Sequence, residues 1–211
     1  MQHRRVFAVA VLSLAFLTGD ARGQGTVAAP PAGADSRPRS VGRIENFGTL
    51  ASFVNLASGT VRLIVITSPS SPNCTSILET VAETLRKNGS RRLRAYVVMT
   101  RLGDLDTEIW AINQMTTLDD RRVVYLWDPK AVAAGTFRPA VNSTTEPATD
   151  VCFLYDTDAR LTPVPPRPEV WMSANPRLDG KPFDAKELGA RADELVRRVE
   201  AKASEAARSS R

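Results

Sequence analysis

Three apolar runs separated by helix-like segments constrain the fold of this chain more than any other feature. The runs are 60–67 (TVRLIVIT), 93–100 (LRAYVVMT) and 121–128 (RRVVYLWD), and β-branched residues are frequent in all three. Continuous apolar runs of strand length are typical of strands that are covered on both faces. Because strands that alternate with helices form a mainly parallel sheet, the sequence predicts the α/β class.

The segments between and around these runs carry helical patterns, in which apolar residues repeat every three or four positions. Helices are predicted at 44–59, 75–89, 102–115 and 184–207, with a short helix at most at 130–137. The helix at 102–115 begins with acidic residues, which the helix dipole favours there. Asp184 is placed to act as the N-cap of the C-terminal helix.

The last part of the predicted sheet differs from the first. Residues 150–161 (DVCFLYDTDARL) predict a strand, a turn at Asp156–Asp158 and the start of a return strand. The following segment, 162–172, is too rich in proline for the middle of a sheet and is predicted to be an edge or a cover. The fold class is therefore α/β, with a central mixed sheet, helices on both faces, a terminal β-hairpin and a C-terminal helix.

The N-terminal segment 1–23 has the layout of a secretory signal peptide. A basic start is followed by an apolar run from Val6 to Leu17 and by the small residues Ala21 and Gly23. A run of this length is shorter than the roughly 20 residues of a spanning helix. The sequence predicts cleavage after Gly23 and a secreted or periplasmic protein without a stable membrane span after processing, with retention as an anchor as the alternative.

The remaining chain divides into three parts. Residues 24–43 are rich in proline, glycine, alanine and serine, which predicts a linker without fixed structure. Residues 44–202 are long enough for one domain with a core of its own. Residues 203–211 are predicted to form a flexible tail.

Composition excludes several classes of function. The only histidine, His3, lies in the predicted signal peptide. A chain without imidazole cannot use a Ser-His-Asp or Cys-His mechanism, and it lacks the commonest zinc ligand. The 28 lysines and arginines are scattered rather than gathered on one stripe, so no nucleic-acid partner is expected. No metal and no cofactor are predicted.

Four short motifs in order resemble those of exported bacterial thioredoxin-like proteins of unassigned role. They are SPSSPNC at Ser68–Cys74, LWDP at Leu126–Pro129, DVCFLYD at Asp150–Asp156 and PPRPEVWM at Pro165–Met172. The resemblance covers roughly residues 44 to 200. It implies a thioredoxin-like fold with a thiol site at the start of the helix that follows the first buried strand.

The chain departs from that family pattern at two positions. The pattern has S-P-x-C-P-x-C, and its first cysteine falls on Ser71, so the motif here is Ser71-Pro72-Asn73-Cys74. The cis-proline of thioredoxins falls near Asp150, while Pro147 is three residues early. A dithiol oxidoreductase needs the first thiol to attack and the second to resolve the mixed disulfide. A serine hydroxyl is barely ionised at neutral pH, so the sequence predicts a degenerate dithiol site.

Three interpretations of Cys74 remain open from the sequence. It is a small core residue, or it forms a disulfide with Cys152, or it is a single exposed thiol. Cys152 itself lies in the middle of an apolar strand, which favours the core. Trp171 is either hairpin cover or the border of a binding groove.

The predicted function is therefore that of an exported, non-dithiol member of the group that binds a peptide or protein partner. The alternative is a weak or monothiol thiol–disulfide oxidoreductase that uses Cys74. A purely structural domain with a Cys74–Cys152 disulfide is the third possibility.

Overall fold

The computed structural model describes residues 40–57 and 59–209, so the predicted signal peptide and most of the predicted linker lie outside the described residues. The described part contains a six-stranded sheet with the order β1-β4-β3-β2-β5-β6. Its strands are β1 (Gly42–Arg43), β2 (Val61–Thr67), β3 (Leu93–Thr100), β4 (Val123–Asp128), β5 (Val151–Tyr155) and β6 (Val170–Ser173). Strands β1 to β4 are parallel, and β5 is antiparallel to both β2 and β6.

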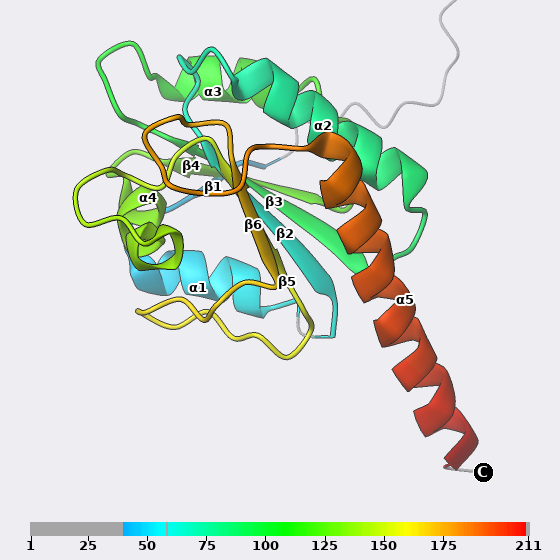
Figure 1. Ribbon diagram of the computed structural model, residues 1–211. Coiled ribbons are helices and arrows are strands. Elements are labelled where there is room, and N and C mark those ends of the chain that lie inside the picture. Colours follow the sequence, from blue (N-terminus) through cyan, green and yellow to red (C-terminus); the bar gives the residue numbers. More distant parts are fainter. Residues whose placement is uncertain (1–39, 58, 210–211) are drawn as a thin grey trace, which may run out of the picture. The chain divides into compact units, whose positions relative to one another are not determined.

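Helices cover both faces of this sheet (Figure 1). They are α1 (Phe47–Asn55), α2 (Cys74–Lys87), α3 (Glu108–Met115), α4 (Val132–Thr136), a 3₁₀ helix η1 (Arg138–Val141) and α5 (Ala185–Ser209). Helices α2, α3 and α5 pack on one face, and α1 and α4 pack on the other. The predicted α/β class, with a mixed sheet between two helical layers and a C-terminal helix, is confirmed. No helix within the described ranges is both long and apolar enough to cross a membrane.

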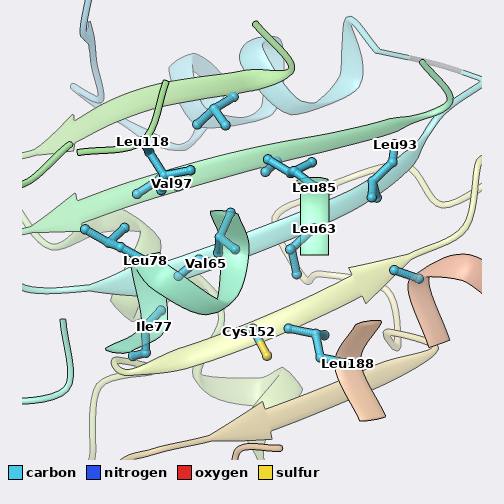
Figure 2. Packing of buried hydrophobic residues seen from close by; sticks show 14 of the residues in the cluster. Leu63, Val65, Ile77, Leu78, Leu85, Leu93, Val97, Leu118, Cys152 and Leu188 are labelled. Atoms are coloured by element: carbon cyan, nitrogen blue, oxygen red, sulfur yellow. The ribbon is translucent and has the colours of Figure 1, made fainter. Parts of the chain in front are cut away.

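The central strand β2 explains why the core has two halves. All seven of its residues are buried. Leu63 and Val65 face the layer of α2 and α5, where Figure 2 shows them with Ile77 of α2 and Leu188 of α5. The intervening Ile64 packs with the other core cluster, on the side of α1 and α4. Alternate residues of one strand therefore anchor both helical layers.

The path of the chain through the sheet places a loop junction at one end of β2. From β2 the chain moves outward to β3 and then β4, and it returns to the other side of β2 to form β5. Because β5 is antiparallel to β2, the carboxyl end of β2 lies beside the start of β5. The segment that follows Thr67 is thereby brought next to Asp150, although 83 positions separate the two residues.

Two boundaries at the ends of the domain differ from the predictions. Strand β1 lies within 24–43, the segment that was predicted to be a linker, and it pairs Gly42 with Leu126. The ring of Phe53 comes within 2.6 Å of where a Cβ on Gly42 would lie, so the absence of a side chain allows this packing. Residues 203–209, within the predicted tail, continue α5 as an exposed, alanine-rich helix, as the helical pattern over 184–207 indicates for most of them.

Two internal elements also differ. Helix α3 begins at Glu108 rather than near 102, because Asp106 accepts hydrogen bonds from the backbone of Leu102 and Gly103 and holds that stretch in a turn. The return strand β6 begins at Val170 rather than directly after Asp158. At the C-terminal helix, the N-cap role of Asp184 is confirmed, since its carboxylate accepts the Glu187 N–H at 2.9 Å.

Candidate functional site

The loop between β2 and α2 forms a tight turn that ends at the first residue of the helix. The N–H of Ser71 donates to the carbonyl of Ser68 at 3.1 Å, and the N–H of Cys74 donates to the carbonyl of Ser71 at 3.1 Å. Asn73 occupies the N-cap position but makes no capping hydrogen bond with its side chain. Its amide is therefore free to reach across the loop junction.

Asp150 lies opposite this turn and receives three side-chain hydrogen bonds. The Thr67 hydroxyl donates to Oδ1 at 2.6 Å, and the Ser71 hydroxyl donates to Oδ2 at 2.7 Å. The Asn73 amide also donates to Oδ2, at 3.1 Å. Asp150 is only 8% exposed. Hydrogen bonds to a carboxylate are stronger than those between neutral groups. The Asp150 carboxylate therefore joins the end of β2, the turn and the start of β5.

The end of β6 belongs to the same polar cluster. The Asn73 amide also lies 3.3 Å from the carbonyl oxygen of Ala174, and the Ala174 N–H donates to the Asp150 carbonyl at 2.8 Å. The hydroxyl of Thr149, next to Asp150, is buried without a hydrogen-bond partner. We call Thr67, Ser71, Asn73, Asp150 and Ala174 the Asp150 cluster.

A second buried carboxylate, that of Asp106, attaches the β3–α3 loop to this site. It accepts the Ser70 N–H at 2.9 Å, and the N–H groups of Leu102 and Gly103 at 2.9 and 3.0 Å. Burial raises the pKa of Asp106, but these backbone and side-chain hydrogen bonds outweigh it, so the pKa lies below its usual value. Asp106 is therefore ionised at neutral pH and fixes the loop beside Ser70.

Cys74 is a free thiol and is only 1% exposed. Burial raises the pKa of this thiol to about 11, the negative charge of Asp150 adds to the rise, and the Thr67 hydroxyl opposes it. A thiol with such a pKa is almost entirely protonated at neutral pH, and the thiolate is the reactive form. The structure thus agrees with the core interpretation of Cys74 and not with that of an exposed thiol.

The interpretation in which Cys74 forms a disulfide with Cys152 does not agree with the structure, in which both cysteines are free and buried. Cys152 pairs in register with Val65 in the middle of the sheet, whereas Cys74 lies beyond the end of β2. Figure 2 shows the Cys152 sulfur among aliphatic side chains, near Leu188 of α5. Burial raises the pKa of Cys152 to about 12.

Trp171, the possible border of a binding groove, does not belong to the Asp150 cluster. It lines a separate cavity of about 570 Å³ together with Pro139, Val164 and Arg167, and the lining includes none of Ser71, Asn73 or Asp150. Its ring packs so closely on Gly180 that a Cβ there would lie 2.1 Å from a ring atom.

The Asp150 cluster has the wrong groups for nucleophilic or metal chemistry. The Ser71 hydroxyl donates a hydrogen bond to a carboxylate that two other donors already engage, and no histidine occurs in the described residues to activate it. Within residues 40–57 and 59–209, no three His, Cys, Asp or Glu side chains could together hold a metal ion. What the cluster does provide is a set of hydrogen bonds that joins three segments: the β2–α2 loop, the start of β5 and the end of β6.

Sequence reasoning placed Ser71, Asn73 and Cys74 together but missed the roles of Thr67, Asp106 and Asp150. The only signal for Asp150 was its place near the expected cis-proline. No peptide bond in the described residues is cis, and Asp150 adopts a left-handed backbone with φ of 53°.

The sheet order defines the class of protein. The helix that begins at the end of the central strand, and the antiparallel pair β5–β6 followed by α5, are arranged as in the thioredoxin-like fold, which the chain therefore has.

The solved structures that match this chain are distant from it in sequence. No protein-family model and no curated protein matches the chain. Among solved structures, a hypothetical protein of Sinorhizobium meliloti 1021 is 18% identical with a TM-score of 0.46, covering 69% of this chain and 74% of its own. A putative thioredoxin from Neisseria meningitidis is 15% identical with a TM-score of 0.45, and the match covers 67% of this chain and 77% of that protein. A thioredoxin-family thiol:disulfide interchange protein from Chlorobium tepidum is 11% identical with a TM-score of 0.44, and the match covers 66% of this chain and 82% of that protein.

Proposed function

We propose that this chain is an exported thioredoxin-like protein with a degenerate dithiol site, which binds an extended segment of another exported protein or peptide without thiol chemistry. One observation carries this proposal. Ser71, at the position of the attacking thiol, donates a hydrogen bond to Asp150, while the neighbouring Cys74 is buried and only 1% exposed.

The position of Asp150 argues against a dormant redox centre. A thiol–disulfide reaction needs a thiolate at the mouth of α2, and a buried carboxylate beside that point disfavours a second negative charge. Because the pKa of Cys74 is raised to about 11, that residue does not replace the missing thiol at neutral pH. The monothiol alternative therefore has no support in this geometry.

The location of the cluster supports binding. In open α/β sheets, ligands bind outside the carboxyl ends of the strands, where the chain changes direction across the sheet. The carboxyl end of β2 is such a point. Strand β3, the next strand in the chain, pairs with one side of β2, and the later strand β5 pairs with its other side. Ser70 and Pro72 are exposed there, so a bound segment could contact them directly.

The test uses an extended protein whose cysteines are blocked, so that only non-covalent binding is measured. The mature chain, residues 24–211, is titrated into fluorescently labelled, reduced and carboxymethylated α-lactalbumin, and anisotropy is followed. We expect saturable binding, weakened at least about tenfold by Ser70→Arg with Pro72→Arg. The matched control is Ser52→Arg, an exposed position on α1.

Two further readings complete the test. Insulin reduction is expected to stay at background for the wild type and for Cys74→Ala. The exported protein is expected to begin at Gln24 on N-terminal sequencing. Absence of binding to alkylated α-lactalbumin would refute the proposal. Insulin turnover that Cys74→Ala abolishes would also refute it and would favour the monothiol enzyme.

A further inference from the structure

Exposed apolar side chains are concentrated on one small part of the surface. Seven large hydrophobic residues of the described chain are exposed, and five of them lie within residues 102–112. We call these five the α3 patch: Leu102, Leu105, Ile109, Trp110 and Ile112. Scattered exposed apolar residues are ordinary, whereas a contiguous group on a folded domain marks an interaction surface.

The spacing of these residues shows why the core does not account for them. Ala111 and Met115 are the buried residues of α3, and they face the sheet. Ile109 and Ile112 are three positions apart on α3, and Leu105 lies in the loop before the helix; Leu105 and Ile109 are 73% and 74% exposed. A surface helix whose only neighbour is the core has a polar outward side. Helix α3 thus has a second apolar face without a partner in the described chain.

The patch is held in a fixed shape. Asp106 binds the backbone of the loop that carries Leu102 and Leu105. Arg43 of β1 donates to the Glu108 carboxylate at 2.6 Å and fixes the start of α3. A preformed surface loses little conformational entropy when it is covered.

We propose that the α3 patch is the interface through which two copies of this chain associate about a two-fold axis. The charged side chains around the patch, its rim, favour a second copy over a partner whose surface carries charges of only one sign. Arg43 pairs with Glu108 and Arg101 pairs with Asp104 within the chain, so these exposed side chains contribute no net charge to the rim and do not repel an identical rim. In an isologous interface each residue meets the same surface of its copy, so a rim with both signs can be complementary to itself.

The size of the patch sets the expected strength. Five partly exposed side chains offer on the order of several hundred Å² of apolar surface per copy, at the low end of specific interfaces. An interface of this size gives weak association, with a dissociation constant of about 1 to 100 µM. The inference does not rest on the proposed peptide-binding function, since the patch lies outside the Asp150 cluster.

Sedimentation equilibrium of residues 24–211 between about 1 and 200 µM tests the proposal. We expect the average mass of the wild type to rise toward that of a dimer, and Ile109→Asp to raise the dissociation constant at least tenfold. Leu56→Asp is the matched control, because Leu56 is 82% exposed and lies outside the patch, at the end of α1. Thermal unfolding of each variant verifies its fold.

A cross-linking measurement locates the interface independently of folding effects. Ile109→Cys is expected to form a disulfide-linked dimer under mild oxidation faster than Leu56→Cys at the same concentration. A wild type that stays monomeric at 200 µM overturns the inference, as does equal weakening by both aspartate variants. If that monomer binds alkylated α-lactalbumin and Ile109→Asp abolishes the binding, the patch belongs to the extended partner instead. The proposed binding site beside the Asp150 cluster is tested separately by the Ser70→Arg and Pro72→Arg substitutions.

Discussion

Placing a thiol at position 71 tests whether Asp150 disfavours redox chemistry at this site. We consider Ser71→Cys in a Cys74→Ala background, so that only one cysteine remains near the mouth of α2. The prediction is that the new thiol has a raised pKa as long as Asp150 is present. Replacing Asp150 with asparagine then lowers that pKa.

The size of the effect follows from the geometry. Ser71 Oγ lies 2.7 Å from Asp150 Oδ2. A thiolate sulfur about 3.3 Å from the carboxylate is repelled by roughly 5 kcal/mol at an effective dielectric constant of about 20. Ser71 is partly exposed, so solvent screening reduces this to about 3 kcal/mol. The helix N-terminus offsets about 1 kcal/mol, which leaves a rise of about 1.5 pKa units, from about 8.5 to about 10.

The assay is the pH dependence of iodoacetamide alkylation, with thiolate absorbance near 240 nm as a second reading. At pH 7.5, Asp150→Asn is expected to increase the thiolate fraction of the introduced cysteine by about two orders of magnitude. The alkylation rate rises by only about tenfold, because a thiolate of lower pKa is less nucleophilic. Glu79→Gln, at an exposed position on α2, removes one charge as a control. A pKa below 8 with Asp150 in place, or the same pKa in both backgrounds, refutes the reasoning.

Three further predictions follow from buried contacts. Neither Cys74 nor Cys152 is alkylated in native protein at pH 8, and both react after unfolding in urea; a thiol that reacts in native protein within minutes contradicts the burial. Asp106→Asn lowers the free energy of unfolding in urea by about 1–2 kcal/mol and speeds proteolysis in the β3–α3 loop, whereas unchanged proteolysis means that the loop is held by other contacts. Gly180→Ala costs about 1–3 kcal/mol and shifts tryptophan fluorescence, because its Cβ would overlap the Trp171 ring; an unshifted spectrum argues against that packing.

The strands could be predicted from the sequence because their signal is local. Residues 93–100 form β3 with the predicted bounds, and β2 differs by one residue, since continuous apolar runs reflect burial on both faces. Strand β1 has two residues and no periodicity, so only its pairing with β4 defines it. The helical segment 184–207 agrees with α5, but the domain boundary at 202 was set too early, because no apolar stripe marks the exposed end of the helix.

Only the part of the candidate site that lies in the β2–α2 loop could be predicted from the sequence. Ser71, Asn73 and Cys74 follow a strand-like run and precede a helical stripe, so their place at the start of α2 is visible in the sequence. Their partner Asp150 is 79 positions from Ser71, and its contact depends on β5 running antiparallel beside β2. An aspartate before a strand is ordinary turn chemistry in a sequence. Its three donors become apparent only in the folded chain.

The backbone at Asp150 carries a last prediction about how far this site is from that of a thioredoxin. Its φ is 53°, a region that asparagine and glycine tolerate and that proline, fixed near −65°, cannot enter. Asp150→Asn should therefore cost about 1–2 kcal/mol of unfolding free energy, through weaker hydrogen bonds to Ser71 and Asn73.

Asp150→Gly keeps the backbone but leaves the buried Thr67 hydroxyl without its acceptor, at about 2–4 kcal/mol. Asp150→Pro must also move the backbone, at about 3 kcal/mol or more beyond the lost hydrogen bonds. Urea unfolding of the three variants is expected to give the stability order Asn, Gly, Pro. A proline variant as stable as the asparagine variant would mean that this loop adopts the thioredoxin backbone readily. With the expected order, a cis-proline cannot be regained here by one substitution, because the polar cluster and the left-handed turn support each other.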